Sequence, residues 1–216
     1  MAGSIVVVDY GMGNLRSVAK AVEHVAPAGT QVLITDSADA ILNADRVVFP
    51  GQGAAADCMA ALHGRGLVAP LAEAARTRPF LGICMGMQVM LSHSEENQGV
   101  HLLNWFEGTV QHFPSMHDAN GLALKIPQMG WNGIRHTHPH PLWHGIADEA
   151  RFYFVHSYFC RPNDTGLVVG STDYGMTYAS ALAQGSVFAI QAHPEKSAAD
   201  GLTLLKNFTR WDGKAD

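Results

Sequence analysis

Short apolar runs alternate with amphipathic stretches over the first ninety residues of the chain. Runs of four or five β-branched or apolar residues are typical of strands that are buried on both faces. We predict such a strand at 5–8, and further strands at 31–35, 47–49 and 80–83. Apolar positions at helical spacing, or alanine-rich composition, predict helices at 14–25, 54–62 and 67–76. Strands that alternate with helices indicate a parallel sheet with right-handed crossovers.

The pattern changes after residue 96, where helical periodicity disappears. Glycine, proline, asparagine and aspartate separate short apolar runs, which suggests antiparallel strands and hairpins. These runs lie near 106–113, 151–155, 167–172, 178–183 and 187–191, and the tail at 197–210 is helical again. We therefore predict an α/β fold with a central, mostly parallel sheet, helices on both faces and an antiparallel C-terminal extension. Because no repeat or linker divides the chain, we expect one domain over 1–216.

Composition narrows the classes of partner. The 216 residues are 47% apolar and 15% charged, as in a compact globular protein. The formal net charge of −5 and the lack of a lysine or arginine cluster argue against nucleic acid. No apolar run is long enough to span a membrane. Three dispersed cysteines and an N-terminus without a basic segment lead us to expect a reducing cytoplasm and no secretory leader.

Residues 80–88, Phe-Leu-Gly-Ile-Cys-Met-Gly-Met-Gln, carry the strongest chemical signal. A strand, a tight turn, a nucleophile and a helix form the layout called a nucleophile elbow. We expect Gly82 to permit the turn and Gly86 to let the helix pack close to the strands. The alternative for Cys84 is a buried core thiol, which is the common state of an isolated cysteine in an apolar run.

A cysteine nucleophile needs a base, and the base needs an orienting group. His193 follows the apolar run at 187–191, Pro194 fixes the backbone beside it, and Glu195 lies two residues further on. We expect Glu195 to hydrogen-bond the imidazole on the side away from the thiol. A solvated polar strand end is the alternative, since the chain has twelve histidines.

Attack on a carbonyl also requires N–H groups that receive the charge on oxygen. The Met85 N–H, directly after the nucleophile, is one candidate. The second lies in the loop Pro50-Gly51-Gln52-Gly53, although such a loop read alone predicts only a turn. Its glycines suggest a gate in which the Gln52–Gly53 amide is misdirected until a partner binds.

Together, the elbow Gly82-x-Cys84-x-Gly86-x-Gln88 and the segment His193-Pro194-Glu195 resemble the class I (triad) glutamine amidotransferases over essentially the whole chain. That resemblance implies a flavodoxin-like fold. Five segments in order further resemble the glutaminase subunits of imidazole glycerol phosphate synthase. They are 9–15 (Asp-Tyr-Gly-Met-Gly-Asn-Leu), 49–53 (Phe-Pro-Gly-Gln-Gly), 127–132 (Pro-Gln-Met-Gly-Trp-Asn), 156–158 (His-Ser-Tyr) and 193–197 (His-Pro-Glu-Lys-Ser).

The resemblance implies hydrolysis of glutamine through a thioester on Cys84, with His193 moving protons and Glu195 orienting it. The ammonia would pass to a cyclase subunit that is built as a (β/α)8 barrel and forms a heterodimer with this chain. The cyclase would use it to make imidazole glycerol phosphate and an aminoimidazole carboxamide ribotide. No cofactor or metal is implied.

The resemblance also assigns further residues by matched position. Those that would hold glutamine are Gly51, Gly53, Gln88, Glu96, Ser157 and Tyr158. Those expected near the subunit interface are Asn14, Trp131, Tyr153 and Lys196. The chain departs from the family at Gln128, commonly His, and at Ala192, commonly Phe.

Three alternatives stay open. Histidines 136, 138, 140 and 144 could bind a metal, although a polar surface loop is the simpler interpretation. The chain could serve another triad amidotransferase, such as the glutaminase of pyridoxal phosphate synthesis, although its Pro-Gly-x-Gly loop speaks against this. It could also be a non-catalytic binding subunit. We interpret Cys58 and Cys160 as structural thiols, because neither has a local His-x-Glu partner.

Overall fold

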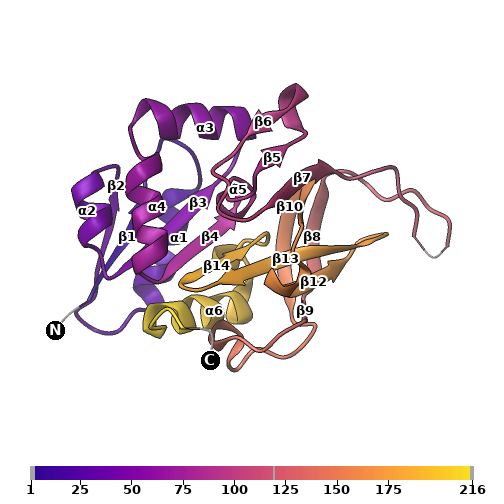
Figure 1. The fold of residues 1–216 in the computed structure, drawn as a ribbon. Coiled ribbons are helices and arrows are strands. Elements are labelled where there is room, and N and C mark those ends of the chain that lie inside the picture. Colours follow the sequence, from indigo (N-terminus) through magenta and orange to yellow (C-terminus); the bar gives the residue numbers. More distant parts are fainter. Residues whose placement is uncertain (1–2, 119, 215–216) are drawn as a thin grey trace.

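A mixed sheet runs through the molecule and carries helices on both faces of its N-terminal half (Figure 1). The computed structural model describes residues 3–118 and 120–214. The strand order is β2-β1-β3-β4-β14-β13-β11-β7-β5-β6, with β12 paired to β13 and β9 paired to β12. The pairs from β2 to β14 are all parallel, and β14 to β13 and β13 to β11 are antiparallel. The predicted fold class is confirmed.

The N-terminal half alternates strands and helices as the apolar pattern predicts. Its elements are β1 (Ser4–Val8), α1 (Leu15–Val25), β2 (Gln31–Thr35), α2 (Ala38–Asn43), β3 (Arg46–Gly51), α3 (Ala55–Gly64), α4 (Val68–Thr77), β4 (Phe80–Cys84) and α5 (Met85–Gln88). The sequence analysis missed α2, a six-residue helix whose first turn is capped by the Ser37 hydroxyl, which accepts from Ala40 N.

The C-terminal half consists of strands, 3₁₀ turns and one long helix. Its elements are β5 (His93–Ser94), η1 (Glu96–Gln98), β6 (Val100–His101), β7 (Gly108–His112), β8 (Gln128–Gly133), β9 (Arg135–His136), η2 (Pro141–Trp143), β10 (Arg151–His156), β11 (Tyr158–Pro162), η3 (Thr165–Leu167), β12 (Val168–Asp173), β13 (Thr177–Gln184), β14 (Val187–Ile190), η4 (Pro194–Lys196) and α6 (Ala198–Arg210). None of the helices within 3–118 and 120–214 is long and apolar enough to cross a membrane.

Strand β1 shows why the sheet is buried on both faces. Val6 and Val8 belong to the core under α2, α3 and α4, whereas Ile5 and Val7 belong to the core that α1 and α6 cover. Successive side chains of a strand point to opposite faces, so a continuous apolar run fills both cores.

One strand of the second half belongs to the parallel sheet. The sequence analysis grouped residues 187–191 with the antiparallel runs, but β14 pairs in parallel with β4 and antiparallel only with β13. Pairing of Ile190 with Ile83 brings the end of β14 beside the end of β4. Two segments more than a hundred residues apart therefore finish at one edge of the sheet.

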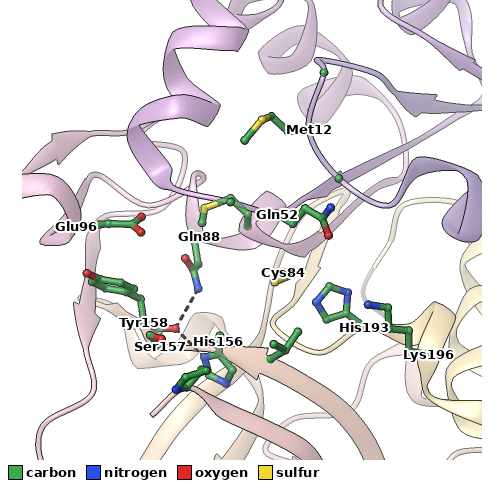
Figure 2. A pocket seen from close by; sticks show the side chains of 16 residues that line it. Met12, Gln52, Cys84, Gln88, Glu96, His156, Ser157, Tyr158, His193 and Lys196 are labelled. Carbon is green, nitrogen blue, oxygen red and sulfur yellow. Dashed lines mark hydrogen bonds between the residues drawn. The ribbon is translucent and has the colours of Figure 1, made fainter.

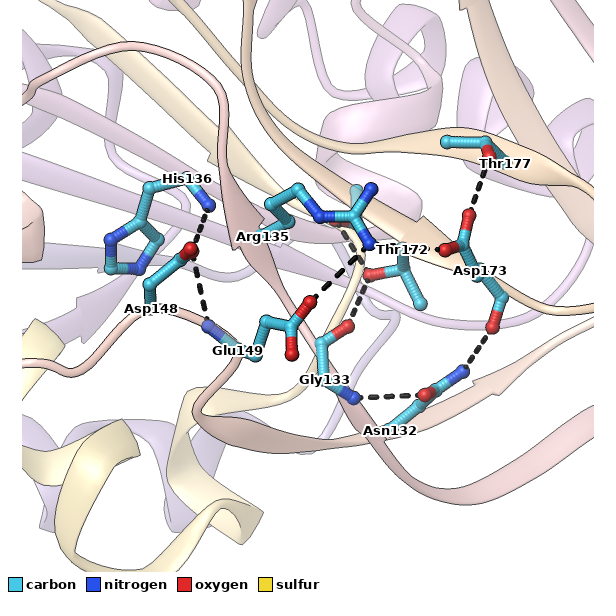
Figure 3. A network of polar contacts seen from close by, with 10 residues as sticks. Asn132, Gly133, Arg135, His136, Asp148, Glu149, Thr172, Asp173 and Thr177 are labelled. Atoms are coloured by element: carbon cyan, nitrogen blue, oxygen red, sulfur yellow. Dashed lines mark hydrogen bonds and ion pairs between the residues drawn. The ribbon is translucent and has the colours of Figure 1, made fainter.

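Strands β8 and β10 form a separate two-stranded ribbon that projects beside the sheet (Figure 1). Polar contacts join it to β12 (Figure 3): Asn132 Nδ2 donates to Asp173 O at 2.8 Å, and Thr172 Oγ1 donates to Gly133 O at 2.9 Å. The exposed Arg135 guanidinium lies 3.3 Å from the Asp173 carboxylate. The hydrogen bonds between uncharged groups hold the ribbon in place, since such an exposed ion pair contributes little to the free energy of folding.

Candidate active site

The chain turns sharply at Cys84 itself. Cys84 has φ 55° and ψ −111°, a conformation that non-glycine residues rarely adopt and that is concentrated at functional sites. Gly82, expected to make the turn, lies within β4 and has no positive φ, so that expectation was wrong. Gly86 does permit close packing, because a Cβ there would lie 2.0 Å from Phe49 O. The helix that follows is a single turn, too short for a large dipole.

The three predicted catalytic side chains meet at the shared edge of β4 and β14. The His193 imidazole lies beside the Cys84 thiol (Figure 2). Its Nδ1 donates to Glu195 Oε1 at 2.9 Å, so Nε2 is the ring nitrogen left for the sulfur, and Nε2 has no other hydrogen-bond partner among the described residues. The side chains of His193 and Glu195 are only 5% and 1% exposed. Nucleophile, base and orienting carboxylate therefore stand in the order that covalent catalysis requires.

Charge around His193 favours the protonated ring. Burial lowers its pKa, but the neighbouring Cys84 and the hydrogen-bonded Glu195 outweigh burial and raise the pKa to about 10. A base with a raised pKa is suited to take up the proton of the Cys84 thiol beside it.

Backbone bonds tie the histidine to the ribbon. His193 N donates to Tyr153 O at 2.9 Å, and Tyr153 N donates to Ser197 Oγ at 2.9 Å. Ser197 Oγ in turn donates to His193 O. The peptide of Tyr153 on β10 is therefore held against both sides of the catalytic histidine segment.

A cavity of about 720 Å³ opens over these residues. Most of the predicted site residues line it: Gln52, Gly53, Cys84, Met85, Gln88, Glu96, Ser157, Tyr158, His193 and Lys196. Figure 2 shows Glu96 and Tyr158 at one end and His193 with Lys196 at the other. Gly51, predicted to hold glutamine, is buried instead. Its smallness is needed because a Cβ would lie 2.3 Å from Tyr10 Oη.

The buried Cys58 thiol contacts the loop at 50–53 from the core. Cys58 Sγ donates to Gln52 O at 3.7 Å and lies 3.8 Å from Tyr10 Oη. Burial raises the pKa of the Cys58 thiol to about 11, so it remains a neutral donor. Because the peptide is planar and trans, the Gly53 N–H points away from Cys58.

Hydrogen-bond acceptors face the far end of the cavity. Gln88 Nε2 donates to Tyr158 O at 3.0 Å, so the Gln88 side-chain oxygen is the amide atom left to accept a hydrogen bond (Figure 2). Glu96 Oε2 accepts from Ala55 N at 2.6 Å, which fixes this carboxylate at the start of α3. The carbonyls of Ser157 and Tyr158 are already engaged, by Phe113 N and by Gln88 with His156.

Gln128 lies beneath the cavity in a buried polar group. His156 Nδ1 donates to Tyr158 O at 2.7 Å, and burial lowers its pKa to about 4, so its Nε2 is an acceptor. Gln128 Oε1 lies 3.2 Å from that Nε2, while Gln128 Nε2 has no partner among the described residues. The Tyr178 hydroxyl completes this group, because it donates to Gln128 Oε1 at 2.8 Å and lies 3.2 Å from His156 Nε2.

Comparison with known proteins identifies the family of the chain. The family profile described as glutamine amidotransferase class-I matches residues 6–211. The chain belongs to the class I glutamine amidotransferase family. It is 56% identical to a protein of Thiobacillus denitrificans over 98% of this chain and 93% of that protein, and 54% identical to one of Pseudomonas putida over 98% and 99%. Both are named imidazole glycerol phosphate synthase subunit HisH.

Solved structures show the same fold at lower identity. PurLQS of Thermotoga maritima superposes on this amidotransferase with a TM-score of 0.70 at 18% identity, covering 97% of this chain and 99% of that one. The glutaminase domain of Trypanosoma brucei CTPS gives 0.60 at 17%, covering 100% and 98%.

The ribbon of the amidotransferase carries exposed apolar side chains beside the cavity. Met129 is 65% exposed and Trp131 44%. The Trp131 and Tyr153 rings pack edge to face with centroids 6.3 Å apart, and Lys196 Nζ lies 6.0 Å from the centre of the Tyr153 ring. Three of the four residues predicted for the interface are therefore neighbours. Asn14 stands at the start of α1 without capping it through its side chain.

The histidine-rich loop of the amidotransferase packs on the core, so the predicted polar surface loop was wrong in part. His136 stacks on Trp143 at 4.5 Å, and His140 packs against Phe188 and Trp211. Among the described residues, no group of three or more metal-ligating side chains is found.

Sequence reasoning missed Gln191. Its side chain is fully buried, and its Nε2 lies 3.7 Å from Cys84 Sγ. A signal was available: a single amide follows the apolar run of β14 and precedes the catalytic histidine by two residues. Ala192, the other departure from the family, is also completely buried.

Proposed function

We propose that this chain is the glutaminase subunit of imidazole glycerol phosphate synthase in histidine biosynthesis, acting in the cytoplasm. The observation that carries the proposal is the Cys84–His193–Glu195 arrangement in a chain whose near-full-length relatives are named as that subunit. Residue roles below follow from this geometry.

The first half-reaction forms a thioester. The Cys84 thiol passes its proton to His193 Nε2 as the sulfur attacks the side-chain carboxamide carbon of glutamine, and the C=O electron pair moves onto oxygen. The Met85 N–H and an N–H of the loop at Gln52 or Gly53 would receive this negative charge. When the tetrahedral intermediate collapses, its C–N bond breaks. The departing nitrogen takes the proton from His193 Nε2 and leaves as ammonia.

The second half-reaction releases glutamate. His193, now neutral, accepts a proton from water as the water oxygen attacks the thioester carbon. The C–S bond breaks, the departing sulfur takes back a proton from His193 Nε2, and the resting site is restored. Glu195 holds Nδ1 throughout, which keeps Nε2 available for both transfers.

The far end of the cavity suits the amino end of the substrate. Among the described residues, the Gln88 oxygen and the Glu96 carboxylate form no ion pair with a lysine, arginine or histidine, so these acceptors would bind the α-ammonium group of glutamine. Because the Ser157 and Tyr158 carbonyls are engaged, these two residues would contribute N–H groups or side chains instead.

We place the (β/α)8 barrel of the cyclase on the β8–β10 ribbon. The exposed Met129 and Trp131 beside Tyr153 give an apolar contact surface, and Lys196 joins it to the cavity. Through the bonds of Tyr153 to the histidine segment, docking there would act on the catalytic base.

Ammonia release measured with and without a partner tests the proposal. Purified chain should hydrolyse glutamine weakly alone and faster when the cyclase and its ribotide ligand are added. Pairing with the synthase of pyridoxal phosphate should give no increase. Equal activity with and without the cyclase would contradict the coupled function.

The loop gate needs its own test. A cyclase-free crystal structure with a glutamine analogue on Cys84 should show the Gly53 N–H turned away from the analogue's carbonyl oxygen. An N–H already bonded to that oxygen would contradict the gate.

A further inference from the structure

One buried amide stands directly behind the nucleophile. Gln191 follows β14, its backbone N donates to Ser180 O at 2.8 Å, and its side chain is 0% exposed. It does not line the cavity, so it has no path to the substrate. Its side chain nevertheless contacts both Cys84 and Gln88, one from each amide atom.

The directions of these hydrogen bonds follow from a single carbonyl. Tyr158 O can only accept, so the Gln88 atom 3.0 Å from it must be nitrogen. The same nitrogen lies 2.9 Å from the Gln191 side chain, which must therefore present its oxygen. The remaining Gln191 atom, 3.7 Å from Cys84 Sγ, is then the nitrogen, which carries N–H donors.

We infer that Gln191 is a further functional residue of the reaction: its N–H stabilises the Cys84 thiolate, and its oxygen fixes the Gln88 amide with the oxygen toward the substrate. An N–H aimed at a buried thiolate acts on the charged form only. Without Gln191, the Gln88 amide would keep one of its two acceptors and could rotate. Only the part about Gln88 rests on the proposed function, because that function identifies glutamine as the substrate that Gln88 binds.

Two variants separate the chemistry of Gln191 from its volume. Gln191→Met keeps the length and removes donor and acceptor. Gln191→Asn keeps the amide but shortens its reach, and it tests the same point if the methionine variant does not fold. Thr209→Val, a buried polar deletion on α6 away from the site, is the matched control. Each variant is the full chain, with folding checked by circular dichroism.

Labelling by iodoacetamide as a function of pH reports the thiolate without any glutamine. Cys58 and Cys160 are fully buried, and peptide mass analysis isolates the Cys84 adduct. In both Gln191 variants we expect the pH midpoint of Cys84 labelling to rise by about one pH unit, and in Thr209→Val to stay. An unchanged midpoint in a folded Gln191 variant would overturn the inference.

Steady-state kinetics with the cyclase partner tests the effect on Gln88. Loss of Gln191 should lower kcat/KM about 10- to 100-fold, with a rise in KM for glutamine. The effects of Gln88→Met and Gln191→Met should not add in the double variant, because the two amides act as one unit. Additive effects would overturn the role toward Gln88. If the Gln191 variants shift the labelling midpoint but the wild-type chain does not hydrolyse glutamine even with the cyclase, the proposed function is refuted. The role of the Gln191 N–H toward Cys84 would still stand.

Discussion

Glu195 accepts a hydrogen bond from His193 at 2.9 Å, although both side chains are almost completely buried. A buried carboxylate beside an imidazole stabilises its protonated form and selects its tautomer. The pair thus sets the protonation state of the base before substrate arrives.

A substitution that removes the charge of Glu195 but keeps its shape isolates the effect of that charge on His193. We expect Glu195→Gln to lower kcat about 10²- to 10⁴-fold with little change in KM, because a neutral amide no longer stabilises the imidazolium. The rate of ammonia release in the presence of the cyclase gives both kcat and KM. Asp200→Asn, on the first turn of α6, should retain full activity. Near-normal kcat in the Glu195 variant would show that the carboxylate is dispensable.

The elbow should not accept a side chain at Gly86. A Cβ would lie 2.0 Å from Phe49 O, a backbone atom that cannot rotate away. We expect Gly86→Ala to lower the free energy of unfolding by about 2–4 kcal/mol. Urea titration measures this. Gly64→Ala, at the open end of α3, should stabilise by about 0.5 kcal/mol. Similar values for the two variants would contradict the crowding.

Buried histidines should make the fold sensitive to acid. Burial lowers the pKa of His140 to about 4, from an ordinary value of 6.5. The unfolded chain therefore binds more protons between pH 6.5 and 4, so His140 contributes stability that is complete above pH 6.5 and is lost as pH falls toward 4. At pH 5 this loss is about 2 kcal/mol.

Urea unfolding at pH 7.5 and pH 5 tests the prediction. His140→Phe should lose about 2 kcal/mol less than wild type on acidification, since its site no longer titrates. Part of the acid sensitivity should remain, because burial also lowers the pKa of His156 to about 4. His24→Gln, on the exposed side of α1, should behave as wild type. Equal acid losses in all three proteins would contradict the assignment to His140.

Trp131 should dominate cyclase binding. Exposed tryptophans at the centre of an interface are the commonest hot spots. We expect Trp131→Ala to weaken the affinity for the cyclase about 30-fold, measured by titration calorimetry. Leu33→Ala, which is also exposed but lies on β2 far along the sheet, should leave the affinity unchanged. Equal losses would place the interface elsewhere.

The sequence was sufficient for strands β1 to β4 because local pattern determines them, whereas α2 and the parallel pairing of β14 were missed. Strands β1, β3 and β4 are apolar runs that are buried on both faces, whereas β2 at the edge of the sheet has no buried residue, and all four runs can be recognised without knowledge of their partners. The same applies to the catalytic trio, since a cysteine elbow and His-x-Glu are local motifs. Strand β8 was missed because Gly130, with φ 137°, and polar residues break its alternation.

Other features depend on contacts that no local pattern contains. The positive φ of Cys84 follows from the surrounding packing, not from its residue type. The relation of Gln191 to Gln88 spans 103 positions, and the attachment of Tyr153 to the histidine segment exists only once the ribbon docks. Long-range pairing of polar groups therefore marks the limit of inference from sequence.

The parallel pairing of β4 with β14 also has a temporal consequence. A ribosome makes Cys84 long before His193, and domains fold from the N-terminal side during synthesis. Every unfinished chain longer than 84 residues therefore contains Cys84, but His193, its proposed base, is not in place until β14 and η4 have left the exit tunnel and joined the sheet. Unfinished chains should thus be unable to consume cellular glutamine.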